Sequence, residues 1–146
     1  MLKVVDKIIK KSDHKFEFID LGGGMGISYE KNDKKDFIIL DAAMNDLMRP
    51  ALYGANHKTL PAIKTSQISK NVYEFVGPIC ESTDKFTTLK KFQKLQEKDL
   101  VVMCDVGAYG MSLSSNYNLR PKSPEILIKG SKINIIKKRQ KLEDLI

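Results

Sequence analysis

Hydrophobic and polar positions alternate along much of this chain in short runs, and each run ends at polar residues, glycine or proline. These runs predict strands at DFIILDA (36–42), NVYEFVGP (71–78), DLVVMCDV (99–106), EILI (125–128) and KINIIKK (132–138). The last two flank Lys129-Gly130-Ser131, a sequence typical of a hairpin turn. Short strands separated by polar loops indicate a mainly β protein with an antiparallel sandwich or barrel-like domain.

The pattern is different before residue 35. Leu2, Val5 and Ile9 recur at a helical period, and FEFID (16–20) then alternates as a strand does before it reaches a run of glycines. Helix, strand and glycine loop predict one α/β unit. A second helical possibility is TTLKKFQKLQEKD (87–99), whose charge indicates an exposed short helix or a long loop.

Length and charge restrict the function classes. The 146 residues suffice for one domain and a short appendage, whereas a (β/α)₈ barrel needs about 250 residues. The net charge of +7 comes from lysine runs interrupted by acids, with few stacking aromatics, which favours a solvated surface over a nucleic-acid site. No apolar run approaches the roughly 20 residues of a membrane span, and the start lacks a signal peptide's apolar centre. We expect a cytoplasmic protein without a membrane partner.

Gly22, Gly23, Gly24 and Gly26 directly follow the predicted FEFID strand. Successive glycines let backbone N–H groups converge on an anion, so this loop could hold a phosphate. Ile27 breaks the dinucleotide fingerprint, and no Lys-Ser/Thr pair follows as in a P-loop. A flexible turn is the alternative interpretation.

Three further stretches could carry chemistry. Arg49 and Tyr53, four residues apart in DLMRPALYGANH, could bind a carboxylate, although a surface ion pair and a core ring are the simpler interpretations. Cys80 and Glu81 in VGPICESTD place a thiol beside a carboxylate, where a buried structural cysteine is the commoner case. Tyr109, between Gly107 and Gly110 at the end of a predicted strand, could contact a flat ligand or a phosphate, or could pack in an ordinary turn.

Cysteine and histidine add no metal site. Cys80 and Cys104 are the only cysteines, and with His14 and His57 they show no spacing typical of zinc ligands. Free thiols in a reducing compartment are expected.

Taken in order, these stretches resemble the diaminopimelate decarboxylases, pyridoxal-phosphate enzymes of the alanine-racemase-like fold class. The resemblance is carried by FIDLGGGMGISY, LDAAMNDLMRPALYGANH, VGPICES, GAYGMSLSSNYNLRP and the ending from PEILIKG to KKRQKLEDLI. It implies that residues 1–34 are a remnant of the family's cofactor-binding barrel and that residues 35–146 are its C-terminal β-domain. The implied reaction converts meso-2,6-diaminopimelate to L-lysine and CO2 in lysine biosynthesis.

The resemblance also implies residue roles. Gly22, Gly23 and Gly24 match the loop that binds the cofactor phosphate, and Tyr109 matches a tyrosine that contacts pyridoxal phosphate. Substrate-binding positions correspond to Arg49, Tyr53 and Glu81. Cys80 matches the catalytic thiol, which, together with Glu81, enters the partner's site in the family's homodimer. Related ornithine enzymes carry Asp after this Cys, so Glu81 favours diaminopimelate.

Some parts of the family pattern have no counterpart in these residues. No lysine stands in the motif that forms the Schiff base with the cofactor, neither histidine matches the one stacked on its ring, and EKNDKKD (30–36) replaces several barrel elements. The sequence therefore predicts an internal deletion and no decarboxylase activity for this chain alone. The alternative is a non-catalytic dimerisation or partner module that completes a separately encoded barrel.

Overall fold

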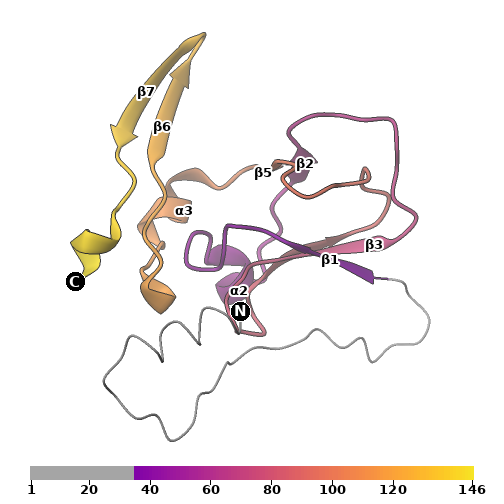
Figure 1. Ribbon diagram of the computed structural model, residues 1–146, viewed down its shortest axis with the longest axis horizontal. Helices are drawn as coiled ribbons and strands as arrows, with labels where there is room; N and C mark the ends of the chain where they lie inside the picture. The colour runs from indigo at the N-terminus through magenta and orange to yellow at the C-terminus, as the bar shows by residue number, and fades with distance from the viewer. Residues whose placement is uncertain (1–34) are drawn as a thin grey trace, which may run out of the picture.

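The strands of the described region form three small sheets. The structure is a computed structural model that describes residues 35–146, so the predictions for residues 1–34 lie outside the described residues. Figure 1 shows the arrangement. The first sheet contains β1 (Lys35–Ile39), β3 (Val72–Val76) and β4 (Lys85–Leu89) in the order β1-β3-β4. The other two pair β2 (Thr59–Pro61) with β5 (Val101–Met103), and β6 (Glu125–Lys129) with β7 (Lys132–Lys137).

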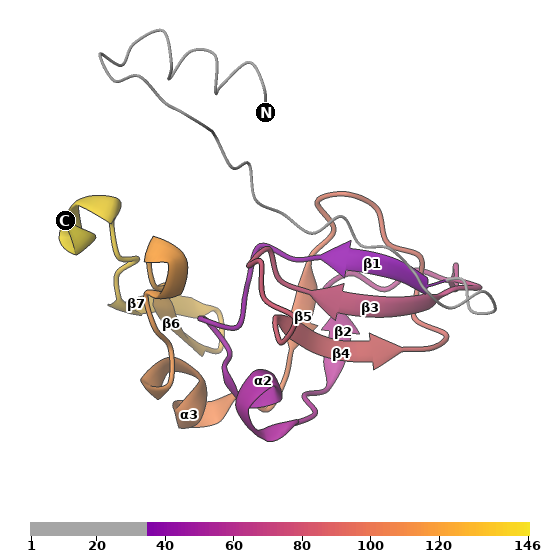
Figure 2. The ribbon, with the colours of Figure 1, turned by 90° about the horizontal axis from the view of Figure 1, so that it is seen from below.

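Most strand pairs are antiparallel, which confirms the predicted fold class. The exception is β1, which pairs with β3 in parallel, with Asp36 opposite Tyr73 and Ile39 opposite Val76. A parallel pair requires a long crossover, and residues 40–71 supply it. This crossover contains α2 (Arg49–Tyr53) and β2, and α2 packs against β4, as Figure 2 shows.

The core lies on one face of the three-stranded sheet. Tyr73 and Phe75 alternate inward from β3, and Phe86 of β4 joins them. Phe75 is fully buried, and its ring centroid lies 5.2 Å from that of Phe92, edge to face. Because aromatic rings bury large apolar areas and prefer this geometry, this cluster is the main source of stability in the described residues.

The segment 87–99 is not a helix. Its first residues, Thr87 to Leu89, complete β4, and only the remainder is irregular, with Gln93 bridging to Ile68. Threonines favour a half-buried strand, and Glu74 opposite Thr88 and Phe75 opposite Thr87 fix the register. The lysines that follow obscured this short strand in the sequence pattern.

Gly54 ends α2 in the left-handed conformation, with φ of 64°, and its N–H donates to the Pro50 carbonyl at 3.0 Å. A Cβ at this position would meet nothing within 4 Å. Only the backbone conformation therefore opposes a side chain. We expect Gly54→Ala to lower the free energy of unfolding by about 1 kcal/mol, measured by urea denaturation. Gly54→Asn, which tolerates this conformation better, should lose less, and equal losses would contradict the explanation.

The β6–β7 hairpin extends away from the first sheet (Figure 1). Its paired strands carry a Lys137–Glu125 ion pair at 3.6 Å. Apolar side chains on it are mostly exposed: Ile126, Leu127, Ile128, Ile133, Ile135 and Ile136. The hairpin was predicted from its sequence, but it packs little against the other described elements.

The remaining helical segments are short. They are α3 (Gly107–Ser112) and the 3₁₀ turns Tyr117–Leu119 and Leu142–Leu145. Within residues 35–146, no helix has the length and apolar character needed to cross a bilayer.

Candidate functional site

Three predicted site residues meet on one surface. Arg49 and Tyr53 lie at the two ends of α2, and Tyr109 lies in α3. The Arg49 guanidinium carbon lies 5.7 Å from the centre of the Tyr53 ring and 5.8 Å from that of Tyr109. Both rings are about two-thirds exposed, at 64% and 66%. The sequence separates Tyr109 from α2 by more than fifty residues, and the fold brings it beside Arg49.

This exposed arrangement excludes the simpler interpretations. Tyr53 is not a core ring, Tyr109 is not packed in a turn, and Arg49 lies between two aromatic faces. The prediction that placed Tyr109 at the end of a strand is wrong, because it lies in the helix after β5. A guanidinium that lies over two aromatic rings keeps its N–H groups available. Such a group suits a carboxylate or a phosphate.

A second group lies in the loop that joins β3 to β4. Cys80 and Glu81 are both exposed there, so Cys80 is not a buried structural cysteine. The Tyr117 hydroxyl donates to a Glu81 carboxylate oxygen at 3.4 Å. A cavity of about 660 Å³ adjoins this loop, and apolar side chains from the outer face of β1, Phe37 and Ile39, line it together with Cys80 and Glu81. A thiol and a carboxylate thus border the same apolar space.

The two groups are separate in the described chain. No hydrogen bond or ring contact within residues 35–146 joins Cys80 or Glu81 to the arginine and its two tyrosines. Ser82 and Thr83, the next residues of the loop, instead share a shallow cavity of about 450 Å³ with Pro50 and Gly54 of α2. The glycine loop, Gly22 to Gly24, lies outside the described residues.

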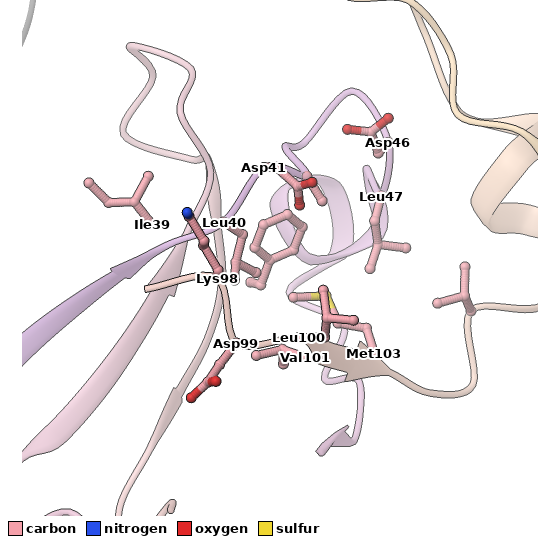
Figure 3. A pocket seen from close by; sticks show the side chains of 13 residues that line it. Ile39, Leu40, Asp41, Asp46, Leu47, Lys98, Asp99, Leu100, Val101 and Met103 are labelled. Carbon is pink, nitrogen blue, oxygen red and sulfur yellow. The ribbon is translucent and has the colours of Figure 1, made fainter. Parts of the chain in front are cut away.

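Another cavity, of about 540 Å³, lies between the end of β1 and β5 (Figure 3). Leu40, Leu47, Val101 and Met103 give it an apolar wall, and Asp41, Asp46, Lys98 and Asp99 are its charged residues. It includes none of the predicted site residues. Because Leu47 belongs to the core cluster, the cavity is best described as an open extension of the core.

The structure adds a buried polar network that the sequence did not reveal. Asn45 is fully buried, and its side-chain oxygen accepts a hydrogen bond from Arg120 Nε at 3.0 Å. Arg120 also donates to the Asp41 carbonyl. This network ties the segment before α2 to the segment before β6. Seventy-five residues separate the partners, so no local motif could have indicated their contact.

His57 is buried and its Nδ1 lies 3.1 Å from the Cys104 carbonyl oxygen. Its Nε2 has no partner in the described part of the chain. No group of three potential metal ligands occurs within residues 35–146.

Comparison with known proteins relates the chain to one family. Residues 4–107 match the family described as "Pyridoxal-dependent decarboxylase, C-terminal sheet domain". A diaminopimelate decarboxylase of Archaeoglobus fulgidus is 40% identical over 116 residues, covering 80% of this chain and 28% of that protein. One of Aquifex aeolicus is 28% identical over 179 residues, covering 89% of this chain and 42% of that protein.

Solved structures agree with these relatives. The diaminopimelate decarboxylase of Helicobacter pylori, complexed with L-lysine, superimposes with a TM-score of 0.67 at 43% identity, covering 80% of this chain and 28% of that one. The chain therefore spans less than half the length of the relatives that it matches.

Proposed function

Because this chain belongs to the pyridoxal-dependent decarboxylases through their C-terminal sheet domain, we propose that it serves as the sheet domain of a diaminopimelate decarboxylase. The observation that carries the proposal is the meeting of Arg49, Tyr53 and Tyr109 on one exposed surface. These residues match family positions for substrate and cofactor, and they come from two separate helices. The family's chemistry depends on pyridoxal phosphate.

The described residues fit one edge of this cofactor. Tyr109 offers an exposed ring and hydroxyl beside the positive charge of Arg49, which suits a flat anionic molecule. Gly22, Gly23 and Gly24 would bind its phosphate through backbone N–H groups. When bound, pyridoxal phosphate supplies a ring that takes up the electron pair left when CO2 departs.

The protein's own residues recognise the far end of the substrate. Diaminopimelate carries a carboxylate and an ammonium there. Arg49 binds this carboxylate through two parallel hydrogen bonds, and the Tyr53 hydroxyl donates a third. Glu81 accepts hydrogen bonds from the ammonium. The Tyr117 hydroxyl donates to the Glu81 carboxylate and holds that side chain in place. Ornithine and lysine have no second carboxylate, so Arg49 would have no partner in complexes with them.

Cys80 donates the proton that replaces CO2. Its exposed thiol adjoins an apolar cavity, and an S–H group can donate its proton there. The Cys80 Sγ proton moves to the carbon that lost CO2, and solvent restores it afterwards. In the family pattern this thiol acts in the partner subunit's site. The separation of the Cys80 loop from Arg49 is consistent with a homodimer of that kind.

The domain boundary near residue 34 is part of the proposal. Residues 1–34 would belong to the barrel, and residues 35–146 to the sheet domain. The alignment with the Aquifex aeolicus relative supports an internal join, because its 179 positions exceed the 146 residues of this chain. None of the lysines in the given residues matches the cofactor lysine, so these residues alone would lack activity.

A chimera tests this function. Residues 35–146 would replace the corresponding domain of the Helicobacter pylori relative, giving an enzyme that we call the barrel chimera. With pyridoxal phosphate and meso-diaminopimelate, we expect the barrel chimera to form lysine and CO2, and the 146-residue chain alone to form neither. Lysine is measured by mass spectrometry.

The control is the same barrel without any sheet domain, which should be inactive. A folded chimera that binds the cofactor but gives no turnover would contradict the function. Turnover by the chain alone would instead contradict its dependence on a barrel.

A non-catalytic partner module is the second candidate. Phe37 and Ile39 expose an apolar surface beside the Cys80 loop, as expected of a domain that binds a barrel encoded by another gene. Turnover from a mixture of this chain and a separately produced barrel would favour the module.

A further inference from the structure

Asp84 is the most fully bonded acidic residue near the Cys80 loop. It is only 3% exposed. One carboxylate oxygen accepts the Met44 N–H at 2.7 Å, and the other accepts the Ile79 N–H at 2.8 Å. Its backbone closes the same loop, because Asp84 N–H donates to the Glu81 carbonyl and its own carbonyl accepts from Gly77. A buried carboxylate with these partners is held in one place.

These bonds fix the backbone on both sides of Cys80. Ile79 precedes the thiol and is held through its N–H. Glu81 follows it and is held through its carbonyl, while its own N–H donates to the Ile79 carbonyl at 2.8 Å. The loop thus has little freedom at the two residues that the proposed reaction uses. Its side chains are exposed, but its backbone is anchored on a buried group.

The other carboxylate bond ties this loop to the segment before α2. Met44 lies in a turn closed by the Ala43 N–H donating to the Asp46 carboxylate at 3.0 Å. The chain then continues through Leu47, a core residue, into the helix that carries Arg49. One side chain therefore sets the spacing between the Cys80 loop and the α2 segment.

Gly77 makes room for this carboxylate. A Cβ on Gly77 would lie 2.2 Å from an Asp84 carboxylate oxygen, well inside contact distance. Since both residues occupy one tight site, a methyl group at residue 77 would displace the Asp84 side chain. Gly77→Ala is therefore a second way to disturb the same anchor without removing the carboxylate.

We propose that Asp84 is a positioning residue for the decarboxylase reaction: through two backbone N–H groups it holds Cys80 and Glu81 at a fixed place relative to α2. The inference rests on the proposed function for its catalytic consequence. Its structural part, the anchoring of the loop, can be measured without any turnover.

The first test measures hydrogen exchange in the 146-residue chain. In Asp84→Asn, one of the two N–H groups would face an NH2 group and lose its acceptor. We expect the amide of Met44 or of Ile79, whichever faces the NH2 group, to exchange about tenfold faster or more, and Cys80 to react faster with iodoacetamide. The amide of Phe75 in β3 should keep its rate, because a general loss of stability would accelerate all of them. Asp36→Asn is the matched control. It removes the carboxylate on β1 that accepts a hydrogen bond from the Asn71 side chain.

The second test uses the barrel chimera. Misplacing a reacting group by about 1 Å can cost 10²-fold in rate. We expect Asp84→Asn and Gly77→Ala each to lower kcat/KM by about 10- to 100-fold, and their combination to add little more because they disturb one anchor. Asp36→Asn should leave kcat/KM unchanged.

The outcomes test the positioning role of Asp84 separately from the proposed decarboxylase function. Unchanged exchange at both Met44 and Ile79 in Asp84→Asn would overturn the positioning role, whatever the chimera does. Faster exchange together with an inactive wild-type chimera would keep the anchor and reject the function. If Asp84→Asn fails to fold, the wild-type chain decides: a scalar coupling across the Ile79 N–H to the Asp84 carboxylate carbon is expected, and its absence would overturn the proposal.

Discussion

Replacing Cys80 by alanine in the barrel chimera is expected to lower kcat by about 10²- to 10⁴-fold, the range that a positioned general acid contributes. The reason is that alanine has no proton to give to the carbon that loses CO2. Cys80 is exposed, and within residues 35–146 no hydrogen bond joins it to the Arg49 group, so its removal should leave substrate binding nearly unchanged. The loss should therefore appear in kcat rather than in KM.

Two variants make this result specific. Cys104→Ala removes the other thiol, which is half-buried and follows β5, and should retain full activity. Cys80→Ser keeps a hydroxyl, a much weaker acid than a thiol, and should recover little of the rate. Lysine formation is followed under saturating substrate. A Cys80→Ala chimera with wild-type kcat would remove Cys80 from the reaction.

Replacing Phe75 by alanine is expected to lower the free energy of unfolding by about 3–5 kcal/mol. Phe75 is fully buried and contacts Tyr73 and Phe92 edge to face, with ring centroids 6.2 Å and 5.2 Å away. Truncation leaves a cavity at the centre of the core and removes both ring contacts. Domains of this size are stable by only about 5–15 kcal/mol, so a large fraction of the stability would be lost.

Urea denaturation followed by circular dichroism measures this loss. Phe37→Ala is the matched control, because Phe37 lies on the same sheet but is 46% exposed on its outer face. It should cost about 1 kcal/mol or less. A Phe75→Ala chain as stable as the Phe37→Ala chain would show that the aromatic cluster is not the centre of the core.

The strands that were predicted correctly share one property. β1, β3, β5, β6 and β7 all contain a clear apolar run bounded by polar residues, glycine or proline, and this local pattern is sufficient. β4 was missed because it combines one buried phenylalanine with two threonines and precedes a lysine run. The parallel pairing of β1 with β3 could not be predicted either, because it depends on the path of the crossover and not on either strand alone.

In the candidate site, too, local patterns could be predicted from the sequence and long-range contacts could not. Arg49, Tyr53, Cys80, Glu81 and Tyr109 could be selected because they stand in recognisable motifs. What the motifs did not indicate was which of them meet, since Tyr109 reaches Arg49 only through the packing of two helices. The role of Asp84 could not be predicted from the sequence either. Its role depends on two backbone N–H groups, one of them forty residues away.

The β6–β7 hairpin has a consequence for how this chain unfolds. A two-stranded ribbon is only marginally stable unless another surface covers it, and this one leaves its isoleucines largely exposed. The aromatic core and the hairpin therefore do not form one cooperative unit. The hairpin would open and close while β3 and β4 stay folded, and its equilibrium would shift with the concentration of any surface that covers it. A single melting temperature would describe the aromatic core and leave the hairpin unmeasured.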